Sequence, residues 1–166
     1  MSWVIRDINI NLSTQDLNRA IREIEQIRTR ILPAADQLVR NLATLGEAIA
    51  QAELLIAHPP AYYFGDLYNS IHADVKRTHA DITAGEGLVD GYGNSYAVHV
   101  EFGTGVHTSG GGGRQDGWVY YNNRDNKFHW TDGMEPRPFM QNTFRKLKDE
   151  AETSGWRVIA EYLAKG

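Results

Sequence analysis

A seven-residue repeat of apolar side chains constrains the fold of this chain more than any other feature. It extends from Leu17 to Ile56, through almost six heptads. One series consists of Leu17, Ile24, Ile31, Leu38, Leu45 and Ala52, and a second consists of Ile21, Ala35, Leu42, Ile49 and Ile56, with Arg28 as the exception. This spacing places the apolar side chains on one face of a helix. We therefore predict a long helix over residues 14–56.

The predicted helix is too long to be covered by one small domain. Forty helical residues extend about 60 Å, at about 1.5 Å per residue. The apolar face therefore packs within its own domain or contacts another subunit, and the length favours a subunit contact for at least part of it. Pro33 removes one helical hydrogen bond and crowds the preceding turn, so we expect a kinked helix or two helices in close succession.

The two ends of the long helix have clear signals. Ser13 or Thr14 can cap its start, and Asp16 lies where negative charge favours the first turn. The prolines of His58-Pro59-Pro60 end the helix, because residues before proline avoid helical geometry. Before the helix, the alternating apolar residues of Trp3–Leu12 are typical of a half-buried strand.

The remaining pattern predicts one α+β domain over residues 1–166. The expected elements are a short helical turn at Gly65–Ser70, strands at Ile71–His79 and Ile82–Asp90, a hairpin of Trp118–Tyr121 with Lys127–Thr131, and an amphipathic helix over 139–164. The pattern of Tyr96–Phe102 fits either a strand or a short helix. We expect the long N-terminal helix and the C-terminal helix to pack on one antiparallel sheet within residues 71–131.

Glycine is concentrated in the centre of the chain, where twelve of the sixteen glycines lie between Gly85 and Gly133. Four of them are consecutive and are followed by a base, as Gly110, Gly111, Gly112, Gly113 and Arg114. Because glycines lose much conformational entropy on ordering and have no side chain to bury, we predict that the loop 106–117 is mobile. We expect it to act as an assembly loop that orders against a neighbouring molecule.

Composition excludes several classes of function. The chain has no cysteine, which excludes disulfides, thiolate zinc sites and cysteine nucleophiles. Its formal net charge is −4, so a domain-wide basic surface for nucleic acid is missing. No apolar run is long enough to cross a membrane, and Met1–Asp7 lack the pattern of a secretory signal.

His99 and Glu101 are candidates for the metal site of a metal-dependent enzyme, because residues two apart on a strand point to the same side. A third ligand would come from His107, Asp116 or His129. The plainer interpretation is a carboxylate bonded to backbone N–H groups, with scattered histidines in solvent. We favour it because no HExxH spacing is present.

The hairpin around residues 118–131 is a candidate for binding single-stranded nucleic acid. Bases lie near aromatic residues there, namely Arg114, Arg124 and Lys127 near Trp118, Tyr120 and Tyr121. Three aspartates offset the charge, and cross-strand aromatic pairs explain the same residues, so we favour a purely structural hairpin. The chain also lacks a complete phosphate-binding glycine motif and a GxSxG nucleophile elbow.

Three short sequence motifs occur one after another along the chain. Phe64–Ile71 (FGDLYNSI) resembles the signature TG-x-L-x-x-S-I, with Phe64 in place of threonine. Tyr96–Thr104 (YAVHVEFGT) resembles Y-A-x-x-V-E-F-G-T, and Gly133–Met140 (GMEPRPFM) resembles P-x-P-F-[ML] at the start of a last helix. Nearly the whole chain is therefore similar to the neck or tail-completion proteins of long-tailed phages, also described as head–tail joining or minor tail proteins.

The resemblance implies a structural virion protein at the head–tail interface, made in the cytoplasm of the bacterial host. Such proteins form rings, typically sixfold, so the implied partners are further copies of the chain, head-side connector or stopper proteins, and tail terminator or tail tube proteins. No catalytic residues belong to the family, and the resemblance implies no cofactor, metal, membrane or sequence-specific nucleic acid. The residues that match its motifs are Gly65, Leu67, Ser70, Ile71, Tyr96, Glu101, Phe102, Gly103, Thr104, Pro136, Pro138 and Phe139.

The motif residues also suit simple structural roles. We expect Glu101 to place its carboxylate against N–H groups of a turn, while Phe102 enters the core. Gly103 permits a backbone geometry that other residues avoid. Pro136 and Pro138 stiffen the entry to the last helix, and the phenylalanine that follows anchors it.

Overall fold

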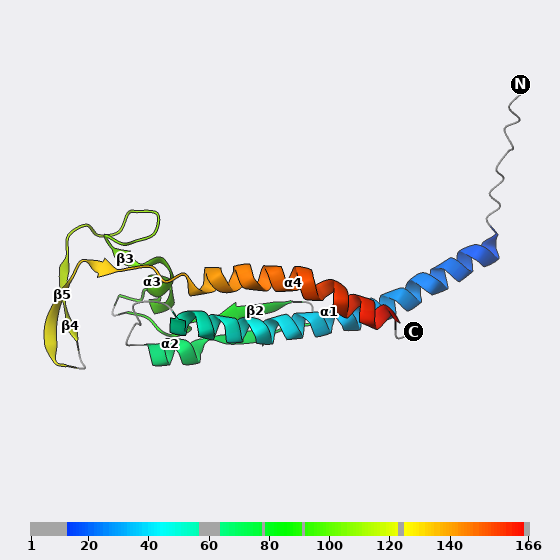
Figure 1. Ribbon diagram of the computed structural model, residues 1–166, viewed down its shortest axis with the longest axis horizontal. Helices are drawn as coiled ribbons and strands as arrows, with labels where there is room; N and C mark the ends of the chain where they lie inside the picture. The colour runs from blue at the N-terminus through cyan, green and yellow to red at the C-terminus, as the bar shows by residue number, and fades with distance from the viewer. Residues whose placement is uncertain (1–12, 57–63, 78, 91, 123–124, 165–166) are drawn as a thin grey trace, which may run out of the picture.

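The computed structural model describes residues 13–56, 64–77, 79–90, 92–122 and 125–164. Two helices dominate an elongated molecule: α1 spans Thr14–Ile56 and α4 spans Phe139–Ala164. They run side by side in opposite directions, and the N-terminal part of α1 extends well past α4 (Figure 1). Both predicted helices and the α+β class are thereby confirmed. The predicted strand in Trp3–Leu12 lies outside the described residues.

Helix α1 begins as the sequence predicts. The Ser13 hydroxyl accepts a hydrogen bond from the backbone N–H of Asp16 (3.1 Å) and donates one to the Asp16 carboxylate (2.5 Å). The helix continues through Pro33 as one element, so the alternative of two separate helices is wrong. Its N-terminal part lies at an angle to the rest (Figure 1), which agrees with the helical hydrogen bond that a proline removes.

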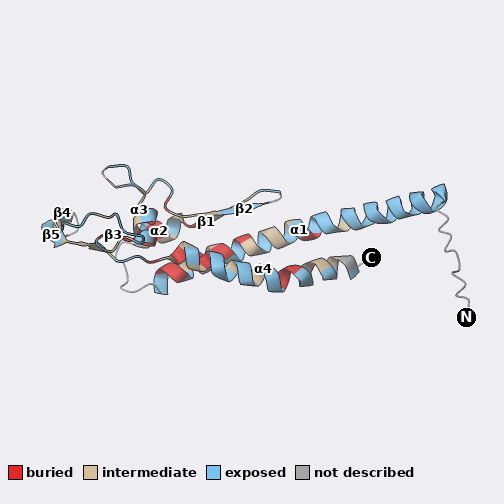
Figure 2. Ribbon diagram, turned by 90° about the horizontal axis from the view of Figure 1, so that it is seen from above, coloured by how far each residue is buried: buried red, intermediate tan, exposed pale blue. Residues whose placement is uncertain are grey.

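The packed face of α1 differs from the heptad seam. Its fully buried apolar side chains include the small residues Ala34, Ala43 and Ala50, while the seam residue Leu45 stays 37% exposed. A strict seven-residue repeat drifts about 20° per heptad around a straight α-helix. By the fourth and fifth heptads the seam has therefore rotated partly away from the face that packs. Buried residues line the part of α1 beside α4, whereas its N-terminal part is exposed (Figure 2).

A hairpin of β1 (His72–Val75) and β2 (Ala80–Thr83) packs along α1. The second strand begins earlier than predicted, because the turn closes with a hydrogen bond from Lys76 N–H to the His79 carbonyl (2.8 Å). The backbone N–H of Ala73 donates to the Glu47 carboxylate of α1 (3.1 Å), which ties the hairpin to the long helix.

The described strands form three two-stranded antiparallel sheets, so the expectation of a single sheet is wrong. Besides β1–β2, these are β3 (Thr104–Gly105) with β6 (Gly133–Met134), and β4 (Trp118–Asn122) with β5 (Lys127–Thr131). The undecided segment is a helix, α3 (Tyr96–Phe102), so it supplies no strand to join the hairpins. The predicted hairpin of residues 118–131 is confirmed and lies at the end of the molecule opposite the N-terminal part of α1 (Figure 1).

The main core lies where the two long helices meet the short helices α2 (Phe64–Ser70) and α3. It consists of Ala50, Leu54, Leu67, Ile71, Ala97, Val100 and Phe139. These residues come from four helices and the residue after α2, so the core joins segments that are far apart in the sequence.

Candidate functional site

The three sequence motifs meet at the main core. Leu67 and Ile71 belong to the first motif, Ala97 and Val100 to the second, and Phe139 to the third, and all are buried in one cluster. Helix α1 contributes Ala50 and Leu54 to the same cluster. The motifs therefore build one packed junction between α1, α2, α3 and α4.

Glu101 connects the second motif to the third. Its carboxylate is buried and accepts hydrogen bonds from the backbone N–H groups of Met140 (2.9 Å) and Gln141 (3.0 Å) in the first turn of α4. The first N–H groups of a helix have no partner within it and carry partial positive charge. Glu101 thus satisfies two donors at the start of a helix distant in sequence, whereas we expected N–H groups of a turn.

Gly103 and Thr104 lie where the chain leaves α3. Gly103 has φ 75° and ψ 176°, a conformation that is essentially restricted to glycine. A Cβ atom there would lie 2.7 Å from the Met134 carbonyl oxygen and 2.9 Å from the Pro136 nitrogen. The Thr104 hydroxyl accepts a hydrogen bond from the Met134 N–H (3.0 Å), so this turn packs directly against the third motif.

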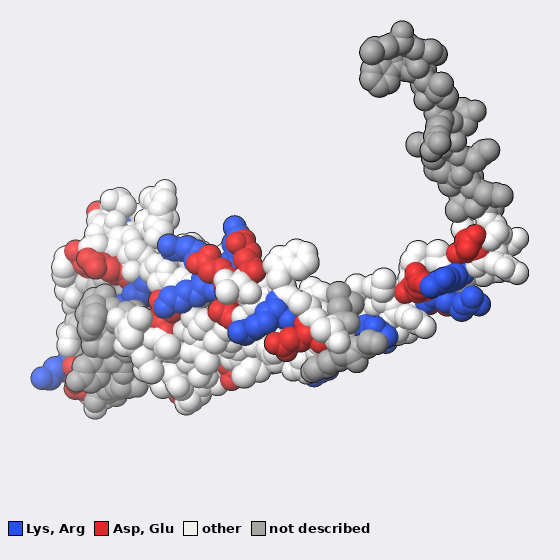
Figure 3. Space-filling model, turned by 45° about the vertical axis from the view of Figure 1, so that its right-hand side comes forward, with Lys and Arg blue, Asp and Glu red and all other residues white. Residues whose placement is uncertain are grey.

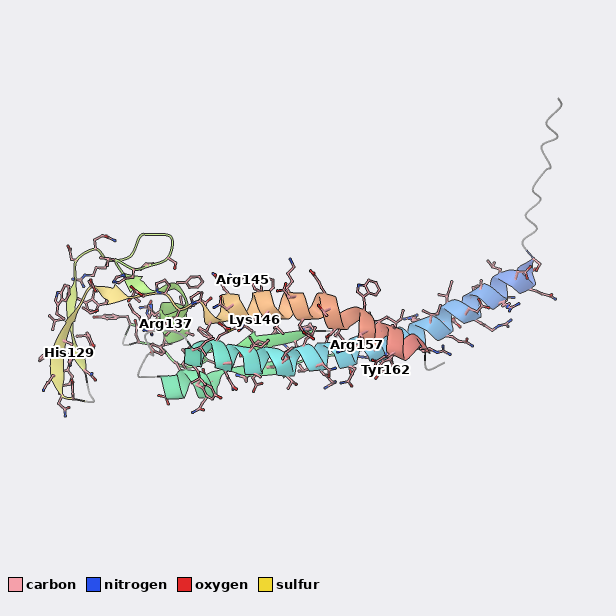
Figure 4. All side chains as sticks on the ribbon, viewed as in Figure 1. His129, Arg137, Arg145, Lys146, Arg157 and Tyr162 are labelled. Carbon is pink, nitrogen blue, oxygen red and sulfur yellow. The ribbon has the colours of Figure 1, made fainter. Side chains whose placement is uncertain are left out.

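Arg137, between the two motif prolines, is a buried cation that the sequence patterns did not single out. Its backbone N–H donates to the Val100 carbonyl of α3 (2.8 Å), and its guanidinium contacts the Met134 sulfur (3.6 Å). Burial lowers the pKa of Arg137 from its usual value. The signal for it was a lone charge between Pro136 and Pro138 at the entry to an apolar helix face. Figure 4 shows Arg137 beside α3, where the chain enters α4.

The first motif holds the loop that precedes α3. The Ser70 hydroxyl donates to the Leu67 carbonyl (2.7 Å) and accepts from the backbone N–H of Gly85 (2.7 Å). At the start of α3, the backbone N–H of Tyr96 donates to the Leu88 carbonyl (2.9 Å). Gly65 lies on the surface with open space around its Cα.

Phe102 does not enter the core, contrary to expectation: 41% of it is exposed. The reason is that residues 96–102 are helical, so Phe102 follows a different face from the buried Val100 and Glu101. It lines an apolar groove of about 620 Å³ between α3 and α4, together with Val98, Met140 and Phe144.

A second polar link, which sequence reasoning missed, joins α1 to α4. The buried Glu53 carboxylate accepts hydrogen bonds from Lys146 Nζ (2.5 Å) and Asn142 Nδ2 (2.9 Å). The Lys146 hydrogen bond holds the pKa of Glu53 below its usual value, although burial opposes this. These partners are about ninety residues apart, so no local pattern could have paired them.

The proposed metal ligands His99 and Glu101 are not brought together. Two residues apart on a helix differ by about 200° in direction, so the geometry argued for a strand does not apply. His99 Nε2 contacts the Asp90 carboxylate (3.3 Å), while Glu101 faces α4. Hydrogen bonds from Asn94 hold the pKa of Asp90 far below its usual range.

The remaining candidate ligands lie apart as well. His107 and His129 contact Asp132 (3.6 Å) and Asp125 (2.6 Å), respectively. Across the described ranges, no three histidines or carboxylates lie close enough to hold a metal ion together.

The β4–β5 hairpin places its aromatic residues in cross-strand pairs. Tyr121 packs against Phe128 with ring centroids 5.1 Å apart, and Tyr120 stacks on His129 at 5.7 Å. Arg114 lies 5.8 Å from the ring of Trp118. Lys127 is exposed at the start of β5, and Arg124 lies outside the described residues.

The glycine run projects from the base of this region. Gly110, Gly111 and Gly112 have positive φ angles and open space around them, whereas Gly113 is packed closely against the Gly105 carbonyl. The N-terminal end of the loop is tied down, since Val106 N–H donates to the Asp132 carbonyl (3.0 Å) and Ser109 N–H to the Phe102 carbonyl (2.8 Å). The mobility of loop 106–117 stays a prediction.

Comparison with protein-family models, curated proteins and solved structures finds no match for the chain. None of the helices in the described part of the chain combines the length and the apolar character needed to cross a lipid bilayer.

Proposed function

We propose that this protein is a neck or tail-completion protein of a long-tailed bacteriophage. It acts without catalysis, as a subunit of a ring, most simply sixfold, that joins the head-side connector to the tail. In this proposal it is made in the host cytoplasm and ends in the virion, where its neighbours are further copies, connector or stopper proteins, and tail terminator or tube proteins.

One observation supports the proposal above the others. The three motifs that carry the resemblance form a single packed junction, in which Glu101 caps α4 and Leu67, Val100 and Phe139 share the core. The motif residues hold helices together and do not position a reacting group. Such motifs suit a structural protein. The elongated outline and exposed apolar side chains at both ends also suit a subunit that contacts several neighbours.

The test is deletion of the gene from the phage genome that carries it. We expect negative-stain micrographs of the lysate to show filled heads and complete tails that are not joined, and expression of the gene from a plasmid to restore joined particles. Purified wild-type virions should contain the protein in a small, fixed copy number. Normal joined particles after deletion would refute the proposal.

Two variants test whether the packed junction is needed for joined particles. Glu152 is exposed on α4 and Glu101 is buried, so plasmids that encode Glu152→Gln and Glu101→Lys should differ. The first should restore joined particles fully. The second places a cation at the start of α4 and should fail to restore them.

A further inference from the structure

The N-terminal part of α1, residues 14–33, which we call the arm, has an apolar stripe in solvent. The stripe consists of Leu17, Ile21 and Ile24, which are 46–65% exposed. Their spacing of i, i+4 and i+7 places them on one face, in the pattern by which a helix lies in an apolar groove. The arm extends beyond the end of α4 (Figures 1 and 2), so α4 covers none of the stripe.

The opposite end of the molecule carries a matching groove. It lies between α3 and α4 and has a volume of about 620 Å³. Val98, Phe102 and Phe144 line it and are 41–69% exposed, although side chains of this kind are usually buried. Its floor includes Phe139, whose other contacts are in the main core.

The stripe cannot reach the groove of its own molecule. The core end of α1, at Ala50, packs in the same cluster as the groove residue Phe139. Ile24 is 26 residues away along the same helix, which corresponds to about 40 Å at about 1.5 Å per residue. Any contact between the stripe and a groove is therefore between two molecules.

Charge supports this pairing. On the helix surface, Asp16 and Glu25 flank the stripe and Arg19, Arg22 and Arg30 lie on the other side, while Arg28 follows the stripe on the same face. Arg145 lies at the rim of the groove, near the start of α4 (Figure 4). Elsewhere on the arm, basic and acidic side chains are mixed (Figure 3). One ion pair there joins Arg19 to Glu23 (3.2 Å).

Pairing of two arms along their seams fits less well. Arg28 occupies the seam position after Ile24. Two arms joined through the full seam would bury Arg28 of each copy without an acidic partner on the seam. A groove that takes only Leu17, Ile21 and Ile24 leaves Arg28 outside.

We propose that the stripe of one copy binds in the α3–α4 groove of the next copy. The contact is heterologous, because each molecule contacts one neighbour through its stripe and another neighbour through its groove. Repetition of such a contact closes into a ring when the rotation between copies allows it. The inference rests on the proposed ring and deepens it by naming the two surfaces that join its subunits.

Because the chain has no cysteine, single cysteines can test the pairing without background. Ile21→Cys labels the stripe and Val98→Cys labels the groove, and both positions are exposed. The two full-length variants are mixed, oxidised and analysed by non-reducing electrophoresis. We expect at least tenfold more disulfide-linked dimer in the mixture than in either variant alone. Trp156→Cys, at an exposed aromatic on the other end of α4, replaces Val98→Cys as the control and should give no such increase.

Two results would overturn the inference. Efficient cross-linking of Ile21→Cys with itself would indicate arm-to-arm pairing, and absence of a mixed dimer would show that stripe and groove do not meet. The proposed function can fail separately. Unjoined heads and tails after deletion, without a mixed dimer, would keep the neck role and discard this contact. A mixed dimer together with normal particles after deletion would keep this contact and discard the neck role.

Discussion

Gly103 shows how much of this fold depends on one residue. It leaves α3 with φ 75° and ψ 176°, and backbone atoms of three other residues surround the position of a missing Cβ. Gly87 has nearly the same φ, 73°, but nothing within 4 Å of that position. Gly87 therefore serves as a comparison position that shares the positive φ and lacks the crowding.

We predict that Gly103→Ala is much more destabilising than Gly87→Ala. Backbone strain alone should cost about 1–2 kcal/mol at Gly87. At Gly103 the clash with the Met134 and His107 carbonyls adds to the strain, so the loss should be about 3 kcal/mol or more. Urea unfolding followed by circular dichroism measures both values. Equal losses in the two variants would contradict the role assigned to the turn.

Single residues also mark the limits of sequence reasoning. The resemblance of residues 96–104 to a family signature singled out Glu101 and Gly103. The prediction that Phe102 enters the core was wrong. Residues 96–102 form a helix, and Phe102 lies on a different face of it from the buried Val100. Arg137 and Glu53 were missed since their burial depends on elements far away in the chain.

At the scale of elements, the packing of α1 depends on a glycine in its interior. A Cβ at Gly46 would lie 2.1 Å from Ile82 Cδ1 of β2 and 2.7 Å from Leu147 Cδ1 of α4. Glycine in a helix costs about 1 kcal/mol relative to alanine, so its presence in a 43-residue helix needs a compensating contact. Here it lets the hairpin and α4 approach α1 at the same point.

We predict that alanine has different effects at Gly46 in α1 and at Gly155 in α4. At Gly155, where the nearest atom is Leu38 Cδ2 at 3.5 Å, alanine should stabilise the protein by about 0.5–1 kcal/mol. At Gly46 the gain in helix propensity is cancelled by overpacking, so Gly46→Ala should be at least about 1 kcal/mol less stable than Gly155→Ala. Thermal and urea unfolding of both variants test this. A gain at Gly46 equal to that at Gly155 would contradict the tight packing described for α1.

The link between α1 and α4 predicts a dependence on pH. The pKa of Glu53 is lowered in the folded protein, chiefly by the hydrogen bond from Lys146. The Glu53 carboxylate therefore binds a proton less readily in the folded protein than in the unfolded chain. The ionised carboxylate stabilises the folded protein above about pH 4.5, and this stabilisation is lost as the pH falls further. Between about pH 6 and pH 3, wild type should lose about 1 kcal/mol more than Glu53→Gln, because half-exposed Lys146 is partly screened by solvent. Parallel pH profiles for the two proteins would contradict this, and Glu152→Gln should follow wild type.

Helices and strands were predictable where a regular pattern of apolar residues extended over many neighbouring positions. The helix over 139–164 has the predicted bounds, and residues 14–56 form one helix, which was one of the two alternatives left open at Pro33. The strand predicted at Ile82–Asp90 is instead Ala80–Thr83, because the tightness of the preceding turn is set by backbone hydrogen bonds. Tyr96–Phe102 could not be decided, since seven mostly apolar residues suit either state until their neighbours are known.

At the scale of the whole molecule, the arm makes the protein much longer than a compact domain of the same size. A compact chain of 166 residues has a radius of gyration of about 15 Å. The 43 residues of α1 alone extend about 65 Å. Neither the direction of α1 nor the position of the β4–β5 hairpin at the other end was predictable, because both depend on contacts between distant elements.

We predict that small-angle X-ray scattering of dilute protein gives a radius of gyration clearly above about 15 Å, because α1 alone is longer than a compact domain of this size. Deletion of residues 1–33 should bring the value close to that of a compact domain, because the truncated chain keeps the packed part of α1 and all of α4. A wild-type value near 15 Å would mean that the arm folds back on the molecule. Measurements at several concentrations remove the contribution of associated copies.

Because α1 is one unbroken helix, its length sets the position of the stripe relative to the core. Each added residue moves the stripe outward by about 1.5 Å and turns it by about 100°. Seven added residues after Pro33 would therefore lengthen the arm by about 10 Å and leave the stripe facing within about 20° of its old direction, whereas two added residues would turn it almost to the opposite side. The number of residues between Leu17 and the core at Ala50 therefore sets how far the stripe lies from the core and which direction it faces.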